Sequence, residues 1–275
     1  EAQYGGKSGY LSHFELFLGD TDDFLFGFSE FYFEHETNET FTNYRNTILK
    51  MILEVLKKYN NRLISINSKL EECNDMEKYN VSTDLVDIKP GFTSFTSSIW
   101  LSLDSASRTC VFHKGDLPPF ILSKNHKEAI KKANILMVDG NEMDAAVEAA
   151  KIAKQTGTKV LYDAGGLYDG VEKLLAESDI IIPSEEFSLA HTGTSNAEDA
   201  SKFLYEKYSP EVVVITQGKK GGIIYDGNEI KQYPAFVVDA IDTNGSGDVF
   251  HGAFAAGLVK GYDFETCCYF SSAVS

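Results

Sequence analysis

The chain has 275 residues, a length that suits one large α/β domain with a small appendage. Its formal net charge of −16 argues against nucleic acid and anionic membranes as partners, and no apolar run is long enough to span a bilayer. The four cysteines show neither metal-ligand spacing nor a disulfide framework, and no secretory signal is visible, so we expect a cytoplasmic protein. Because the chain starts at Glu1 and stops at Ser275 within a helical pattern, we expect a piece of a longer protein.

Residues 1–72 predict a divergent N-terminal α/β segment whose chemistry the sequence does not reveal. A glycine loop with Gly5 and Gly6 comes first. The alternating aromatic residues of 24–28 are typical of a half-buried strand, and the apolar residues of 48–59 recur at helical spacing.

A hairpin and a βαβ unit follow. Residues 92–113 predict two antiparallel strands. The buried-type strand 135–138 ends at Asp139, an alanine-lined helix ends at Gly157, and the next strand ends at Asp163. This pattern implies parallel strands joined by a right-handed crossover. In open α/β sheets ligands sit beyond the carboxyl ends of the strands, where both aspartates are expected.

Two further strands each run into a polar turn. Strand 180–183 leads into a helix that starts near Ser184. Strand 211–215 is rich in β-branched residues, so we expect it to be central and buried. It runs into the turn Thr216–Gly221, and residues 223–233 then predict a hairpin with a tight turn.

The most informative stretch is Asp242-Thr243-Asn244-Gly245-Ser246-Gly247-Asp248, which joins an apolar strand to a helix with one apolar face. Small residues allow backbone N–H groups to approach a ligand, and the positive end of the helix dipole favours an anion. A carboxylate beside an anion site is costly unless it has a task, such as accepting a proton from a hydroxyl that attacks a phosphate. The alternative interpretation of Asp248 is an ordinary helix cap.

This stretch, with Phe250, closely resembles the signature Asp-Thr-x-Gly-x-Gly-Asp-x-Phe of the ribokinase-like (PfkB) carbohydrate kinases, and it lies in the strand–turn–helix context that the signature requires. The resemblance implies that Asp248 is the catalytic base. It also implies that Gly245, Ser246 and Gly247 form an anion hole for the transferring phosphoryl group.

The resemblance runs from Cys73 to Ser275 and implies further roles. Thr216, Gly218 and Gly221 match a Thr-x-Gly-x-x-Gly pattern that lies against ATP in the family. By position, Asp139 resembles the acid that reaches the sugar, although a strand-end cap remains an equal alternative.

The family's di-glycine motif, which lines the sugar site, is only faintly matched. Gly5 and Gly6 stand in its place, but Tyr10 occupies the position of the expected Asn. A loose glycine loop is the alternative interpretation.

Metal ligands are less well matched. The family's Asn-x-x-Glu motif, which organises hydrated Mg²⁺ and phosphates, has Ser184 and Phe187 at its two key positions. Glu186 either substitutes for the missing acid or is a solvated acid favoured by the helix dipole. Asp242 and the carbonyl of Asn244 resemble the family's ligands for a monovalent cation such as K⁺.

The resemblance therefore implies an α/β fold: a Rossmann-like, three-layer αβα sandwich with a mostly parallel sheet and a small β lid. Residues 1–72 would be an incomplete sugar lobe or lid, and residues 73–275 a kinase core truncated at its C-terminus. The expected activity is transfer of phosphoryl from ATP, with Mg²⁺, to a hydroxyl of a small sugar or sugar-like acceptor. The alternatives are an adenosine-type nucleoside kinase and a kinase-like binding protein that has lost catalysis. A homodimer formed through the lid is a further alternative.

Overall fold

The computed structural model describes residues 76, 78–89, 91–93, 95–102, 107–238, 243 and 245–275. The chain divides into two units, residues 1–118 and 119–275, which are treated separately. The prediction of an α/β segment over residues 1–72 lies outside the described residues. None of the helices in the described part is long and apolar enough to cross a lipid bilayer.

In the first unit, β1 (Thr96–Ser102) and β2 (Ser107–His113) form an antiparallel hairpin. Its register pairs Thr96 with His113 and Ser102 with Ser107. The two strands predicted within residues 92–113 are thus confirmed, whereas the role of a lid stays a prediction.

The second unit is built around a mixed sheet. Its described strands have the order β3 (Ile135–Val138), β4 (Lys159–Ala164), β5 (Ile180–Pro183), β6 (Val212–Thr216), β7 (Gly222–Tyr225) and β8 (Ile230–Tyr233). Neighbouring strands from β3 to β6 are parallel, and β7 and β8 add an antiparallel hairpin. The mostly parallel sheet is as predicted.

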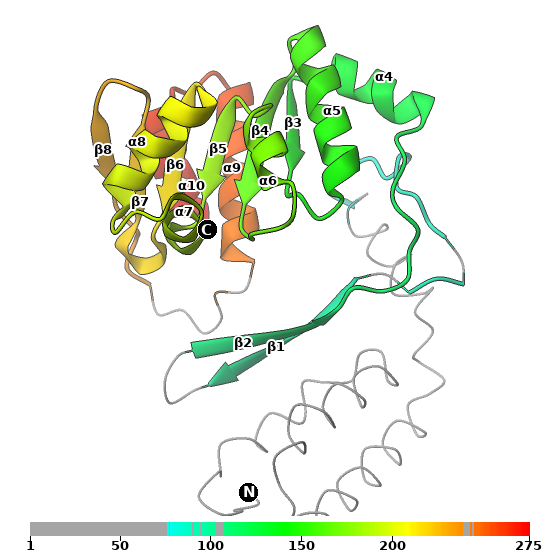
Figure 1. The fold of residues 1–275 in the computed structure, drawn as a ribbon, viewed down its shortest axis with the longest axis horizontal. Coiled ribbons are helices and arrows are strands. Elements are labelled where there is room, and N and C mark those ends of the chain that lie inside the picture. Colours follow the sequence, from blue (N-terminus) through cyan, green and yellow to red (C-terminus); the bar gives the residue numbers. More distant parts are fainter. Residues whose placement is uncertain are drawn as a thin grey trace, which may run out of the picture. The chain divides into compact units, whose positions relative to one another are not determined.

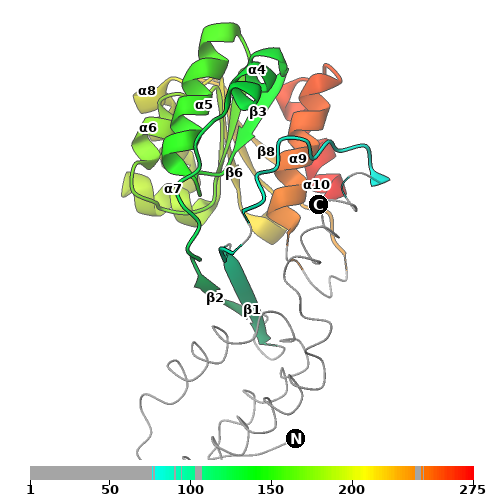
Figure 2. The same cartoon turned by 90° about the vertical axis from the view of Figure 1, so that its right-hand side faces the viewer.

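Helices cover both faces of this sheet (Figures 1 and 2). One face carries α4 (Lys124–Lys132), α5 (Met143–Thr156), α6 (Val171–Leu175), α7 (Glu185–Thr192) and α8 (Ala197–Tyr208). The other carries α9 (Ser246–Val259) and α10 (Phe264–Val274). The predicted three-layer αβα arrangement is therefore confirmed.

Strand β6 explains why the central strands read as continuous apolar runs. Val213 and Ile215 pack with the cluster under α8, whereas Val212 and Val214 pack with the cluster under α9 and α10. Successive side chains of a strand point to opposite faces, so a strand covered on both sides must be apolar at every position. The parallel strands run toward one end of the sheet, where α9 also begins (Figure 1).

Candidate active site

The glycine turn before α9 has the geometry of an open helix start. Gly245 is the residue before the helix and has the left-handed conformation, with φ of 78°. No side chain of the described residues caps this turn, and a helix start leaves backbone N–H groups without intrahelical acceptors. A Cβ added at Gly247 would meet nothing within 4 Å among the described residues. The N–H of Ser246 donates to the carbonyl oxygen of Thr243 at 3.3 Å, so the turn can present its other amides to an anion directly and that of Ser246 after a change of partner.

Asp248 lies in the first turn of α9 but does not cap it. The cap position belongs to Gly245, three residues earlier, and the Asp248 carboxylate is exposed. One of its oxygens would be 3.8 Å from a Cβ added at Gly245, so the carboxylate lies beside the glycine turn. Asp248 thus does not hold the position of an ordinary N-cap, and its role as the catalytic base stays a prediction.

His251, one turn later on α9, ties this helix start to the ends of two strands. Its Nδ1 is 2.6 Å from the carbonyl oxygen of Gly247, and its Nε2 is 3.0 Å from that of Ile182 on β5. Nε2 is also 3.3 Å from a carboxylate oxygen of Asp163 on β4. The sequence reasoning missed His251. Its only signal was a polar ring inside an otherwise apolar helix.

Asp163 is the partly buried acid of this group. Burial raises its pKa, the charge of His251 opposes that effect, and the nearby carboxylates of Asp248 and Asp139 raise the pKa further. The acids at the ends of β3 and β4 and the acid of α9 are therefore close enough to influence one another, as expected for carboxyl ends of neighbouring parallel strands.

The side chain of Asp139 is engaged by its own turn. Its carboxylate accepts hydrogen bonds from the backbone N–H of Asn141 at 3.0 Å and from the Asn141 side-chain amide. The turn leads into α5. This contact supports the strand-end interpretation, while the sugar-binding role stays a prediction.

Ser184 and Thr216 lie side by side at the ends of β5 and β6, where they form an isolated parallel bridge. The hydroxyl of Ser184 accepts the N–H of Phe187 at 3.1 Å and so caps α7. The structure thus brings together two residues that the sequence assigned to the nucleotide site, although the Ser184 hydroxyl already has a structural partner.

The two glycines of the turn after β6 have different surroundings. A Cβ added at Gly221 would overlap the backbone oxygen of Tyr233 and lie 2.7 Å from the nitrogen of Ala235. A Cβ added at Gly218 would meet nothing within 4 Å among the described residues. Gly221 is therefore required by close packing of backbone, whereas Gly218 has an open face that suits contact with a ligand.

The start of α7 holds the residues of the expected metal motif. Phe187, at the position of the family Glu, is 2% exposed and packs in the core, so it cannot take the place of that acid. Glu186 is exposed, whereas Glu185 reaches the turn after β6 and accepts a hydrogen bond from Gln217 at 2.7 Å. The described residues contain no group of three or more metal-ligating side chains of the His, Cys, Asp and Glu types. Glu186 as a substitute for the missing acid therefore stays a prediction.

Four predicted site residues lie outside the described residues. They are the glycines proposed for the sugar site and the ligands proposed for a monovalent cation: Gly5, Gly6, Asp242 and Asn244.

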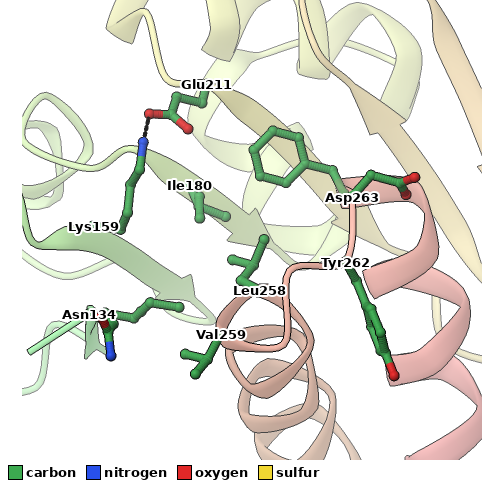
Figure 3. Close-up of a pocket in the computed structure, with 10 residues that line it drawn as sticks. Asn134, Lys159, Ile180, Glu211, Leu258, Val259, Tyr262 and Asp263 are labelled. Carbon is green, nitrogen blue, oxygen red and sulfur yellow. Dashed lines mark hydrogen bonds and ion pairs between the residues drawn. The ribbon is translucent and has the colours of Figure 1, made fainter.

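A hollow of about 480 Å³ lies at the opposite end of the sheet. Figure 3 shows Lys159 and Ile180, which begin β4 and β5, facing Leu258 and Val259 near the end of α9. Lys159 is paired with Glu211 across its rim. None of the predicted site residues that the structure describes lines this hollow, so it is separate from the described part of the candidate active site.

A family model described as pfkB family carbohydrate kinase matches residues 73–275. Among curated proteins, a cytidine kinase of Thermococcus kodakarensis is 33% identical over 102 residues, 36% of this chain and 36% of the relative. A ribokinase of Arabidopsis thaliana is 30% identical over 165 residues, 57% of this chain and 44% of the relative. The chain thus spans less than half the length of these two relatives.

Solved structures give a consistent picture of the fold. The Arabidopsis thaliana ribokinase complexed with ribose and ATP has a TM-score of 0.58 at 25% identity, covering 66% of this chain and 62% of the other. An adenosine kinase from Sinorhizobium meliloti has a TM-score of 0.59 at 20% identity, covering 67% of this chain and 60% of the other.

Proposed function

The chain belongs to the pfkB family of carbohydrate kinases, and we propose that the protein transfers the γ-phosphoryl group of ATP to a hydroxyl of a sugar or sugar-like acceptor. The observation that carries this proposal is the position of Asp248. Its exposed carboxylate stands in the first turn of α9, beside an uncapped glycine turn and without a capping role. Relatives named ribokinase and cytidine kinase support the reaction class.

Asp248 acts as the general base in this proposal. Its carboxylate accepts the proton of the acceptor hydroxyl as that oxygen bonds to the γ-phosphorus and the bond to the ADP leaving oxygen breaks. The amides of Gly245, Ser246 and Gly247 stabilise the negative charge that develops on the phosphoryl oxygens. Because the turn is formed before substrate arrives, no reorganisation is needed at the moment of transfer.

The ATP phosphates would lie along the carboxyl ends of β5 and β6. Gly218 offers an open backbone face there, and the Thr216 hydroxyl is a donor at the end of the strand. Gly221 shapes the turn, and Ser184 lies next to Thr216. A solved relative complexed with ribose and ATP supports ATP as the donor.

The proposed metal ligands are separate from the residues assigned to the transfer step. Mg²⁺ is the expected companion of ATP in this family, but the described residues do not form a cluster that fits it. Glu186 as a Mg²⁺ ligand, and Asp242 with Asn244 as K⁺ ligands, remain proposals.

The proposed acceptor is a sugar or a nucleoside. Relatives and neighbours named ribokinase, cytidine kinase and adenosine kinase support both, and Asp139, Gly5 and Gly6 are the proposed contacts. ADP release should be measured with ribose, cytidine, adenosine and 5-dehydro-2-deoxygluconate in turn. Turnover with ribose but with neither nucleoside would favour the sugar kinase, and the reverse would favour the nucleoside kinase.

The general base is tested by Asp248→Asn, which keeps the shape and removes the base. We expect kcat to fall by roughly 10²–10⁴-fold, the usual contribution of general-base catalysis, with ATP affinity unchanged or improved. Asp263→Asn is the matched control, because Asp263 caps α10 by accepting the N–H of Thr266 at 2.7 Å and Asn caps about as well. If Asp248→Asn retains more than about a tenth of kcat, the assignment fails, since a base is worth at least ~10².

The second candidate is a kinase-like binding protein without catalysis. The buried Phe187 in place of a metal-organising acid favours it. In that case calorimetry should show that ATP binds, while none of the four acceptors named above should lead to release of ADP.

A further inference from the structure

His251 is the buried polar group that the reaction steps above do not use. Its side chain comes from α9, is 5% exposed and stacks edge-on against Phe250. Each ring nitrogen lies within hydrogen-bond distance of oxygen, with Gly247 on one side and Ile182 and Asp163 on the other. A buried ring with contacts on both sides has a fixed orientation.

The two ring nitrogens of His251 reach two different elements. Nδ1 lies 2.6 Å from the carbonyl oxygen of Gly247 on its own helix, and Nε2 lies 3.0 Å from that of Ile182 on β5. Both carbonyl oxygens are acceptors only, so the ring is the donor wherever such a bond is made. The contact of Nε2 with Asp163 at 3.3 Å adds a link to β4.

The bond to Gly247 acts on the peptide unit that follows the proposed anion hole. The carbonyl of Gly247 and the N–H of Asp248 belong to this unit. A ring N–H that donates to the carbonyl holds the unit in place and polarises it, because hydrogen bonds in chains strengthen one another. His251 thus fixes the first turn of α9 between the anion-hole amides and the Asp248 carboxylate.

We propose that His251 is the positioning residue of this site: it ties the first turn of α9 to the ends of β4 and β5 and so sets the Gly245–Gly247 amides and the Asp248 carboxylate in place. The proposal rests on the proposed phosphoryl transfer. Asp163 from β4 lies 3.3 Å from Nε2 of His251, and the charges of Asp248 and Asp139 in turn raise the pKa of Asp163.

The first test reads the ring itself and needs no activity. In protein labelled with ¹⁵N-histidine, the His251 signals are assigned by their loss in whichever of His251→Gln and His251→Phe folds. We expect a ring N–H of His251 that exchanges slowly with solvent, because the ring is buried and lies within hydrogen-bond distance of two carbonyl oxygens. A ring N–H that exchanges as fast as that of an exposed histidine would overturn the proposal.

The second test separates positioning from support of the fold. His251→Gln keeps one donor, and His251→Phe keeps a ring without donors. We expect kcat to fall by about 10- to 10²-fold, as for a misplaced catalytic group, more in Phe than in Gln, while the KM for ATP changes less than about threefold. A variant that is folded by circular dichroism and keeps parental kcat would sink the positioning role. His191→Gln, a second partly buried histidine on α7, is the control and should keep kcat.

The outcomes distinguish the two proposals. If Asp248→Asn keeps kcat, the proposed base fails whatever the His251 variants do. If Asp248→Asn loses kcat while His251→Gln and His251→Phe keep it, only the positioning role fails.

Discussion

Replacing Gly221 by alanine should destabilise the second unit far more than the same change at Gly218, three residues earlier in the same turn. Both glycines have positive φ, +85° at Gly221 and +54° at Gly218, so alanine is strained at either position. They differ in what the new methyl group meets. At Gly221 it overlaps the backbone oxygen of Tyr233 and lies 2.7 Å from the backbone nitrogen of Ala235, whereas at Gly218 it meets nothing within 4 Å among the described residues.

Two effects set the expected loss of unfolding free energy: backbone strain and overlap of the new methyl group with its neighbours. Left-handed backbone costs an ordinary residue roughly 1–2 kcal/mol, and Gly221, whose ψ of −115° lies outside the left-handed region, should cost at least as much. Overpacking adds roughly 1–3 kcal/mol, and here the obstacle is backbone of the β8 segment, which cannot rotate away. Gly218→Ala should therefore cost about 1–2 kcal/mol of unfolding free energy and Gly221→Ala about 2–5 kcal/mol.

Urea unfolding followed by circular dichroism measures both changes in one experiment. In thermal melts each kcal/mol should lower Tm by about 2–4 °C in a domain of this size. Equal losses of stability in the two variants would refute the argument from close packing at Gly221. If Gly218 faces ATP, Gly218→Ala should also weaken ATP binding, which calorimetry would measure.

Three further changes test other parts of the fold. Burial, and then the charge of Lys207, lowers the pKa of His191, so folding favours the neutral ring. Its contribution to the free energy of unfolding should be fully present above about pH 6.5, the usual His value, and be lost as the pH falls below it. In urea titrations at several pH values, His191→Gln should reduce this pH dependence. Burial raises the pKa of Cys267 to about 11 and raises that of Cys268 as well; iodoacetamide should label both only in urea, and labelling in the folded protein would contradict their burial. Phe254 on α9 is fully buried in the core, so Phe254→Ala should cost about 3–5 kcal/mol of unfolding free energy, measured by denaturant unfolding.

Local patterns were sufficient to predict the layers and the glycine turn. Alanines at helical spacing predicted α5, and the β-branched run of 211–215 predicted a strand buried on both faces, because each pattern records which side of an element is covered. The turn before Asp248 was readable since its glycine has a backbone conformation that other residues rarely adopt.

The rest depends on contacts between distant segments. His251 contacts the carbonyl oxygen of Ile182, which lies 69 residues earlier in the chain, and no helical pattern in α9 predicts that partner. Gly221 matched a nucleotide-binding pattern, but the structure shows that β8 backbone packs against it. Phe187 looked like a lost metal ligand in the sequence, and only its burial shows that the position belongs to the core.

The acids at this end of the sheet oppose an incoming phosphoryl group. The charges of Asp248 and Asp139 raise the pKa of Asp163, and a phosphoryl group would add further negative charge at the same turn. Helix dipole attraction is worth about 0.3–1 kcal/mol at an exposed site, too little to offset several carboxylates near an incoming anion. The proposed anion hole must therefore supply further attraction through its amides. His251 contacts Asp163 without occupying the open face of the turn, and Asp248 stays exposed beside the glycine turn, where the proposed base has to meet the acceptor hydroxyl.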